Sequence, residues 1–359
     1  MGASGKVRVA VIGAGGFAEI CHVPGVQSHP RAEVVALCGR NAERCRAMAD
    51  RLGVPEAISD YQEVVARPDI DAVTITTPNV AHHPIATAAF AAGKHVFCEK
   101  PLAMTRAEAE AMRQAAEASG RIHQVAFTFR FTHCLQRLRE ELARGTIGRP
   151  FYIRAHGEGF GDLRPGGRGG WRHVRALAGG GMLADMGSHY FDLVNWIVEP
   201  VAEVCGILET IPREKTVGEE TVTVDSDDLA ACWFRTSGGV SGQFFSSRVT
   251  PSRGANGYFE VIGETGALYA ATTRGGGDAL RLLRPGAAEM ELPLPEESHS
   301  KQDYALGRMM RAFVDAILAG RSNPDVDATF ADGWRAQCAQ DAVFASVRQK
   351  RWIPVDAGD

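Results

Sequence analysis

The sequence predicts an α/β protein of two domains: an N-terminal doubly wound parallel sheet, and a C-terminal α+β domain with a large, mostly antiparallel open sheet. Three observations support this fold class. At 359 residues the chain is longer than a single hydrophobic core usually serves. Its first part alternates buried strand patterns with helical patterns of about 10 to 15 residues, which is typical of parallel βαβ units. Beyond residue 129, short strand patterns follow one another across tight turns, which is typical of antiparallel pairing.

The N-terminal domain is expected to cover residues 1–128. Residues 7–12 form an apolar run interrupted only by Arg8, as expected of a strand that is buried on both faces. Further strands are predicted at residues 33–38, 71–76, 94–98 and 121–127. The helices between them are predicted at residues 42–52, 82–92 and 106–119.

The C-terminal domain is expected to cover residues 129–359. It begins with a helix at residues 132–144 and a strand at residues 151–156. A glycine-rich segment, residues 157–181, then leads into a helix that contains Asp185 and His189. Strands are predicted at residues 203–209, 228–235, 240–248, 258–262, 267–272 and 280–283. Two closing helices within residues 301–349 are expected to pack back on the body of the protein.

Composition excludes several classes of protein. The formal net charge of −4 at pH 7 gives no reason to expect a nucleic acid or an anionic membrane as partner. No apolar run reaches the roughly 18 residues that a transmembrane helix needs. The eight cysteines include no C-x-x-C pair and several lie in apolar strand patterns, which favours free thiols in a reducing compartment. We therefore expect a cytoplasmic protein, and no His or Cys cluster predicts a metal site.

A glycine-rich turn follows the first strand. Residues 13–18 read Gly-Ala-Gly-Gly-Phe-Ala, a G-x-G-x-x-A pattern that lets a pyrophosphate rest on the N–H groups at the start of the next helix. This pattern predicts a Rossmann-type dinucleotide site made by Gly13, Gly15, Gly16, Phe17 and Ala18.

The end of the second predicted strand bears on the choice of dinucleotide. NAD-selective sites carry a carboxylate there for the ribose, whereas this chain has Gly39 and Arg40. The guanidinium of Arg40 suits a 2′-phosphate, so the sequence favours NADP over NAD. The alternative is that Arg40 stacks on the adenine without discriminating between the two.

Two features point to proton chemistry. Lys100 precedes Pro101 at the end of the strand predicted at residues 94–98, where ligands of open α/β sheets bind, and the proline keeps it out of the helical conformation. Asp185 and His189 are four residues apart after three glycines, so on a helix they share one face. A carboxylate beside an imidazole fixes its tautomer and stabilises its charged form. The alternative is a helix start in which both side chains are only capped or packed.

These motifs, in this order along essentially the whole chain, resemble the Gfo/Idh/MocA family of glucose–fructose oxidoreductase-like and inositol dehydrogenase-like enzymes. The matching segments are residues 13–18, 77–82, 99–101, 171–172, 179–192 and 261–266. The resemblance implies catalytic roles for Lys100, Asp185 and His189, and a homodimer or homotetramer built through the C-terminal sheet. It extends the cofactor contacts to Thr77, Pro78, Asn79, His82, Glu99, Lys100, Trp171 and Arg172.

The resulting hypothesis is an NAD(P)-dependent oxidoreductase that transfers hydride between the nicotinamide and a secondary alcohol or ketone of a sugar, glycoside or cyclic polyol. His189, tuned by Asp185, is expected to act as the base, and Lys100 to stabilise the developing alkoxide. The substrate is expected to contact Lys100, Arg130, Asp162, Trp171, Arg172, Asp185 and His189. Two alternatives remain: an NAD-dependent glycosidase that works by transient oxidation at C3, and a non-catalytic dinucleotide sensor that docks on a transcription factor.

Overall fold

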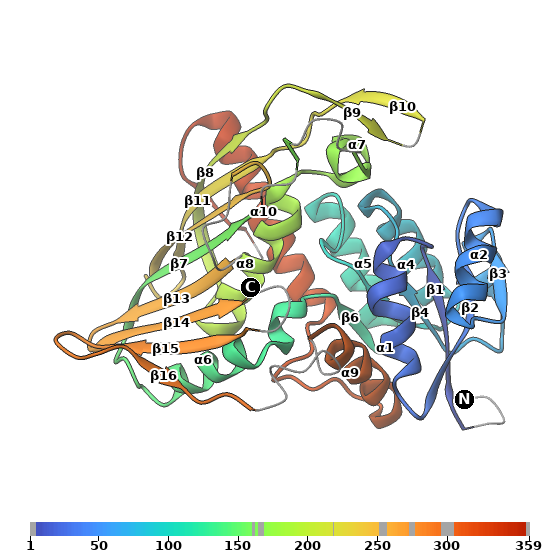
Figure 1. Ribbon diagram of the computed structural model, residues 1–359, viewed down its shortest axis with the longest axis horizontal. Helices are drawn as coiled ribbons and strands as arrows, with labels where there is room; N and C mark the ends of the chain where they lie inside the picture. Colours follow the sequence, from blue (N-terminus) through green and yellow to red (C-terminus); the bar gives the residue numbers. More distant parts are fainter. Residues whose placement is uncertain are drawn as a thin grey trace. The chain divides into compact units, whose positions relative to one another are not determined.

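The chain divides into two compact units in the computed structural model (Figure 1). The structure describes residues 5–159, 162–163, 169–217, 219–250, 257–272, 277–295 and 305–356. Unit 1 consists of Met1–Phe131 and Ala305–Trp334, and unit 2 consists of Thr132–Tyr304 and Arg335–Asp359. The division differs from the expected one, because the helix α9 (Ala305–Ala319) and the start of α10 (Phe330–Gln349) belong to unit 1.

Unit 1 contains a six-stranded sheet in the order β3-β2-β1-β4-β5-β6, in which every neighbouring pair is parallel. Its strands are β1 (Val7–Ile12), β2 (Ala32–Cys38), β3 (Glu56–Ile58), β4 (Ala72–Ile75), β5 (His95–Cys98) and β6 (His123–Val125). The predicted doubly wound parallel sheet is confirmed. The strand order changes direction between β1 and β4, and ligands of open α/β sheets bind beside such a point.

The helices of unit 1 follow the boundaries that their capping residues set. The unit contains η1 (Ala18–His22), α1 (Val23–Gln27), α2 (Ala42–Leu52), α3 (Tyr61–Ala66), η2 (Asn79–Ala81), α4 (His82–Ala91), α5 (Arg106–Ser119), η3 (Thr128–Phe131) and α9. The side chains of Asn41 and Thr105 each accept a backbone N–H at the starts of α2 and α5. Gly53 and Gly120 end these helices in the left-handed conformation.

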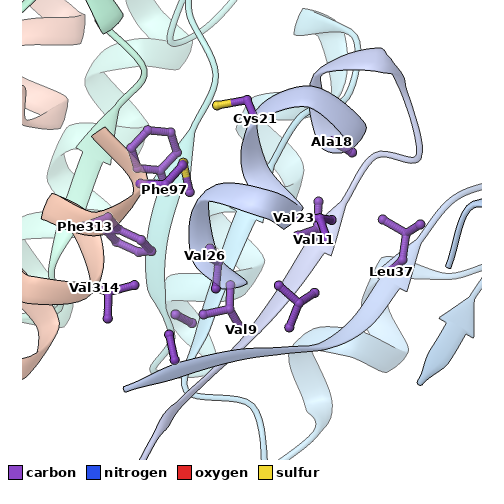
Figure 2. Packing of buried hydrophobic residues seen from close by; sticks show 14 of the residues in the cluster. Val9, Val11, Ala18, Cys21, Val23, Val26, Leu37, Phe97, Phe313 and Val314 are labelled. Carbon is purple, nitrogen blue, oxygen red and sulfur yellow. The ribbon is translucent and has the colours of Figure 1, made fainter. Parts of the chain in front are cut away.

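The core of unit 1 explains why α9 belongs to it. Figure 2 shows part of one buried cluster, which includes Val9, Val11, Leu37, Phe97 and Phe313. The rings of Phe97 in β5 and Phe313 in α9 meet edge-on with centroids 5.4 Å apart. Where α1 and α9 cross, a Cβ at Gly25 would lie 2.6 Å from that of Met310, so the glycine permits their close contact. The apolar face of α9 therefore completes this core from a distant part of the chain.

Unit 2 contains a nine-stranded sheet in the order β16-β15-β14-β13-β7-β12-β11-β8-β17. The strands are β7 (Pro150–Glu158), β8 (Val201–Glu209), β11 (Leu229–Thr236), β12 (Ser241–Ser247), β13 (Gly257–Gly263), β14 (Gly266–Thr272), β15 (Ala279–Leu283), β16 (Met290–Leu292) and β17 (Ile353–Pro354). The pair β7 and β12 is parallel and the other pairs are antiparallel, so the predicted mostly antiparallel sheet is confirmed. A separate hairpin of β9 (Glu214–Val217) and β10 (Glu220–Thr223) was not predicted.

The helices α6 (His133–Ala143) and α8 (Ser188–Ile197), the turn η5 (Leu183–Gly187) and the later part of α10 pack on one face of this sheet (Figure 1). Unit 2 also contains η4 (Trp171–His173) and α7 (Arg175–Ala178). Phe191 of α8 meets Phe244 of β12 edge-on at 5.2 Å, and a Cβ at Gly206 would lie 2.6 Å from Val343 of α10. Because strand residues alternate between faces, the neighbour of Phe244, Phe245, lies on the opposite face.

Candidate functional site

The glycine-rich turn of unit 1 lies beside the point where the strand order changes. Gly13 follows β1 with a φ of +119°, and a Cβ there would lie 2.6 Å from the carbonyl carbon of Thr76, so this position requires glycine. Thr76 follows β4, and its hydroxyl donates to the carbonyl of Gly13 at 2.9 Å.

The next two glycines lie on the open side of this turn. A Cβ at Gly15 or Gly16 would have no described atom within 4 Å. A phosphate therefore has room to approach the backbone there. Phe17 is partly buried, and the side chain of Ala18 is fully buried in the core cluster, so the small size of Ala18 serves the packing of η1.

The end of β2 has no space for the carboxylate side chain that binds the ribose in NAD-selective sites. A Cβ at Gly39 would lie 2.7 Å from the Cβ of Ala14, so the glycine-rich turn excludes a side chain at this position. The next residue, Arg40, is exposed. The absence of a carboxylate is therefore part of the packing of this turn, and Arg40 is the first side chain after the strand that can meet a ribose.

We name the segment after β5, residues 99–101, the catalytic turn, after the role that the sequence predicts for Lys100. It lies at the same edge of the sheet as the glycine-rich turn, and the N–H of Glu99 donates to the carbonyl of Ile75 in β4 at 2.9 Å. The Lys100–Pro101 peptide is cis. Unit 1 thus brings Lys100 to the sheet edge that the sequence predicts.

His82 ties the catalytic turn to the segment after β4. Its ring is fully buried, with Nδ1 3.0 Å from the carbonyl oxygen of Pro101 and Nε2 3.1 Å from that of Thr77. Burial lowers the pKa of His82. The neutral ring has one N–H and donates to one of the two carbonyls at a time. His82 therefore holds the backbone of both segments in place. Pro78 and Asn79 lie between Thr77 and His82 in the sequence, and Asn79 is 3% exposed.

His22 makes a second buried contact with the catalytic turn. The last residue of η1, it lies with Nε2 3.0 Å from Oε1 of Glu99, and its ring is fully buried. The other carboxylate oxygen of Glu99 accepts the N–H of Lys100 at 3.3 Å. Sequence reasoning missed His22, although a single histidine in an apolar helix so soon after the glycine-rich turn was a usable signal.

Unit 2 carries the predicted acid and imidazole on one helical segment. Asp185 lies in η5, which is a π-helical turn, and His189 lies in α8, which continues it without a break. Asp185 is half-buried and His189 is 6% exposed. The predicted helix is confirmed, and its π-helical first turn is of a kind that occurs frequently at functional sites.

A buried carboxylate fixes the start of this segment. Asp227 accepts the N–H groups of Gly181 at 2.6 Å and Leu183 at 2.8 Å, while its own carbonyl accepts the N–H of Met182 at 2.9 Å. A Cβ at Gly181 would lie 1.7 Å from the Asp227 carbonyl oxygen, so the third glycine of the run is required by this contact. Burial raises the pKa of Asp227, and the two N–H groups partly offset it. Sequence reasoning missed Asp227.

Trp171 and Arg172 lie against the same helical segment. The guanidinium of Arg172 stacks on the Trp171 ring, with its central carbon 4.4 Å from the ring centroid. Its Nε lies 3.7 Å from Oδ1 of Asp185. Unit 2 therefore brings together Trp171, Arg172 and Asp185, as the sequence predicts.

Two predicted substrate residues have partners within the protein. Oδ2 of Asp162 lies 2.7 Å from Nε2 of His173 and 3.1 Å from Nε of Arg248. Burial opposes ionisation of Asp162, but the hydrogen bond from His173 and the nearby arginine charges outweigh it and lower its pKa. In unit 1, Arg130 has a side chain only 3% exposed and lies 3.2 Å from Asp332. These contacts account for both side chains without a substrate.

Within the part of the chain that the structure describes, no group of three or more His, Cys, Asp or Glu residues is arranged to hold a metal ion. No helix in the same part is both long and apolar enough to span a membrane.

Comparisons with known proteins agree with the motifs. A family model described as an oxidoreductase family with an NAD-binding Rossmann fold (GFO_IDH_MocA) matches residues 7–127, and the model of a GFO/IDH/MocA C-terminal domain matches residues 135–269. A levoglucosan dehydrogenase from Pseudarthrobacter phenanthrenivorans is 29% identical over 349 residues, which cover 88% of this chain and 87% of that protein. A 1,5-anhydro-D-fructose reductase from Ensifer adhaerens is 33% identical over 267 residues, covering 73% and 75%. Among solved structures, a levoglucosan dehydrogenase in complex with NADH matches with a TM-score of 0.88 and 26% identity, covering 98% of this chain and 99% of that one.

Proposed function

The chain belongs to the Gfo/Idh/MocA oxidoreductase family, and on that premise we propose that it transfers hydride between a nicotinamide dinucleotide and a secondary alcohol or ketone of a sugar, glycoside or cyclic polyol. One observation carries the proposal: Lys100 lies at the cofactor edge of the parallel sheet, on a turn whose backbone is held by buried side chains. A structural lysine would not need such support, whereas a group that must meet a reacting oxygen does.

The chemistry divides among three side chains of the protein. His189 accepts the hydroxyl proton during oxidation, and Asp185 orients its ring and stabilises its charged form. The ammonium group of Lys100 donates a hydrogen bond to the reacting oxygen and stabilises the negative charge that develops there. The bound nicotinamide supplies the hydride acceptor. In the reductive direction the same groups return the proton to the product alcohol.

The substrate class follows from the side chains beside Asp185. The Trp171 ring offers an apolar face and Arg172 offers donors to hydroxyl groups, which together suit a pyranose. The two sequence relatives are named for levoglucosan and 1,5-anhydro-D-fructose, which are both anhydrosugars. Anhydrosugars and glycosides are therefore the first substrates to test.

NADP is the proposed cofactor, although the structure of the similar levoglucosan dehydrogenase holds NADH. Support comes from Arg40, which is exposed, and from Gly39, where Ala14 leaves no room for a carboxylate. Changing Arg40→Ala should lower the ratio of kcat/KM with NADP to that with NAD by about 10-fold. Gly39→Asp alone should impair both cofactors, and adding Ala14→Gly should restore activity with NAD. A wild-type protein that prefers NAD would contradict the proposal.

A second copy of the chain is the proposed partner of the open sheet face. That face carries a row of stacked rings, with His156 and Tyr258 5.4 Å apart and Tyr258 and Tyr269 5.1 Å apart. Trp233 on the same face is 51% exposed. Sedimentation of the wild type should give a dimer or tetramer, and Trp233→Glu should shift it to a smaller species. A monomeric wild type would remove this proposal.

Cytoplasmic location is proposed on the state of the cysteines. All eight are free thiols, and seven of them are buried. Buried free thiols are stable in a reducing compartment.

The test of function is a cofactor-reduction screen with NADP and NAD in parallel over anhydrosugars, glycosides and inositols. The expected result is reduction of the cofactor by at least one pyranoside or anhydrosugar. Release of free sugar without net reduction would identify the glycosidase alternative instead, although neither of the two sequence relatives above is named as one. No turnover across the panel with cofactor still bound would indicate the sensor alternative.

A further inference from the structure

We propose that His22 is a positioning residue for Lys100, acting through the buried carboxylate of Glu99. The proposal deepens the function proposed above and rests on the role given there to Lys100. It links the helix that follows the glycine-rich turn to the catalytic turn, which comes much later in the sequence.

The contacts form one continuous chain. His22 Nε2 lies 3.0 Å from Oε1 of Glu99, and Oε2 of the same carboxylate accepts the backbone N–H of Lys100 at 3.3 Å. The side chain of His22 is 0% exposed and that of Glu99 is 11% exposed. A carboxylate with so little access to water must be held by protein donors, and these two contacts supply them.

The surroundings leave His22 one way to satisfy its proton. Its ring meets Phe97 edge-on at 5.5 Å, and its Nδ1 is buried with no hydrogen-bond partner among the described residues. Figure 2 shows that Phe97 and Cys21, the neighbour of His22, belong to the apolar cluster of unit 1. A neutral ring with its proton on Nε2 places its one N–H on Glu99 and leaves only an acceptor unmet. This tautomer fixes the carboxylate, and the carboxylate fixes the backbone at Lys100.

The position of His22 gives the contact its consequence. η1 begins directly after the glycine-rich turn, and the N–H of Glu19 in η1 donates to the carbonyl of Gly15 at 3.3 Å. The short helix η1 therefore contacts the glycine-rich turn at its start and the catalytic turn at its end. Glu99 directly follows β5, and the sequence resemblance implies only a cofactor contact for it; this contact with His22 assigns it a positioning role.

The first experiment needs no activity. Hydrogen exchange of the cofactor-free protein is measured at the Lys100 amide in the wild type, His22→Leu, His22→Gln and His29→Leu. His29 is the matched control, because it is 8% exposed and lies 3.1 Å from the carboxylate of Asp315 but has no contact with the catalytic turn. His22→Leu should exchange at least about 10-fold faster at Lys100. His22→Gln, which keeps a donor, should restore most of the protection, and His29→Leu should leave it unchanged.

The second experiment measures turnover and binding separately. His22→Leu should lower kcat about 10-fold while the dissociation constant of the reduced cofactor stays within about 3-fold, because a misplaced group costs rate before it costs binding. In a Lys100→Met background, the same change should have no further effect on the residual rate.

The outcomes separate this proposal from the function itself. Equal exchange at Lys100 in His22→Leu and wild type overturns the positioning role, whatever the activity. A full additive effect of His22→Leu on Lys100→Met, or an equal loss of kcat in His29→Leu, overturns it too. Absence of wild-type turnover on every substrate counts against the proposed function, and the exchange measurement still decides the role of His22.

Discussion

The catalytic turn of unit 1 and the start of the helical segment that carries Asp185 and His189 in unit 2 hold their backbones by opposite means. The turn follows a strand and exposes carbonyl groups, and the imidazole of His82 lies against the carbonyl of Pro101. The helix start exposes N–H groups, and the carboxylate of Asp227 accepts those of Gly181 and Leu183. Each segment therefore recruits the side chain that its own unpaired backbone groups require.

The difference teaches where each arrangement is vulnerable. The neutral imidazole of His82 has a single N–H and lies between two carbonyl groups. Its hydrogen bond to the turn therefore depends on which ring nitrogen carries the proton. A carboxylate has room for several donors, so Asp227 satisfies both N–H groups at once. Removing Asp227 leaves two buried N–H groups without an acceptor. Removing His82 frees one contact of the catalytic turn, but the N–H of Glu99 still bonds the turn to the sheet.

The largest expected effect is on turnover. Lys100→Met and His189→Ala should each lower kcat by at least about 10²-fold with cofactor binding retained, because each removes a group that acts on the reacting oxygen or its proton. Stopped-flow cofactor reduction measures kcat, and fluorescence titration measures cofactor binding.

Lys94→Met is the matched control, since Lys94, just before the start of β5, is buried and donates to the carbonyl of Ile70 at 2.8 Å. It should cost stability and leave the turnover of folded protein unchanged. Near-normal turnover in both catalytic variants would remove the assignment.

The second effect is on stability and belongs to the helix start. Asp227→Ala should lower the free energy of unfolding by about 2 to 4 kcal/mol, because two buried N–H groups lose their acceptor. Urea unfolding measures the change. Asp225→Ala is the control, since Asp225 accepts the N–H of Arg175 at 2.6 Å at an exposed helix start and should cost about 1 kcal/mol. Equal costs for the two variants would show that burial does not distinguish them.

The sequence predicts the segments on both sides of this comparison but not the residues that hold them. The strand ends, the glycine-rich turn, the Glu99–Pro101 turn and the helix of His189 all leave local patterns, since strand and helix periods and glycine spacing depend on neighbouring residues. Asp227 leaves none, and His22 leaves only a single histidine soon after the glycine-rich turn, because each acts on a segment far away in the sequence. A polar residue inside an apolar pattern marks only that some partner exists.

Two of the predicted substrate residues illustrate the same limit. Arg130 and Asp162 read as charged groups near functional motifs, and only the structure reveals Asp332 and His173 as their partners. The placement of α9 in unit 1 has the same cause, since the contact of Gly25 with that helix depends on packing that no local period records. Long-range partners were therefore the unpredictable part of both the fold and the site.

The smallest expected effect is on the stability of unit 1 in acid, which should fall at a higher pH than the contribution of Asp162 in unit 2. His95 and His123 in unit 1 accept the N–H groups of Ile122 and Phe330 through Nδ1, and a proton on that nitrogen breaks the bond. Burial lowers both pKa values, that of His95 to about 4 with help from the Arg121 charge. The unfolded chain, with a histidine pKa of about 6.5, binds protons first, so stability is full above that pH and falls as the pH decreases toward 4. Replacing both histidines by Asn, whose amide oxygen still accepts the N–H, should make the decrease of Tm between pH 6.5 and 4 smaller by about 2 to 4 °C. Asp162 of unit 2 has a lowered pKa, so its contribution to the free energy of unfolding is lost only at more acid pH. An unchanged acid response in the double variant would place the sensitivity elsewhere.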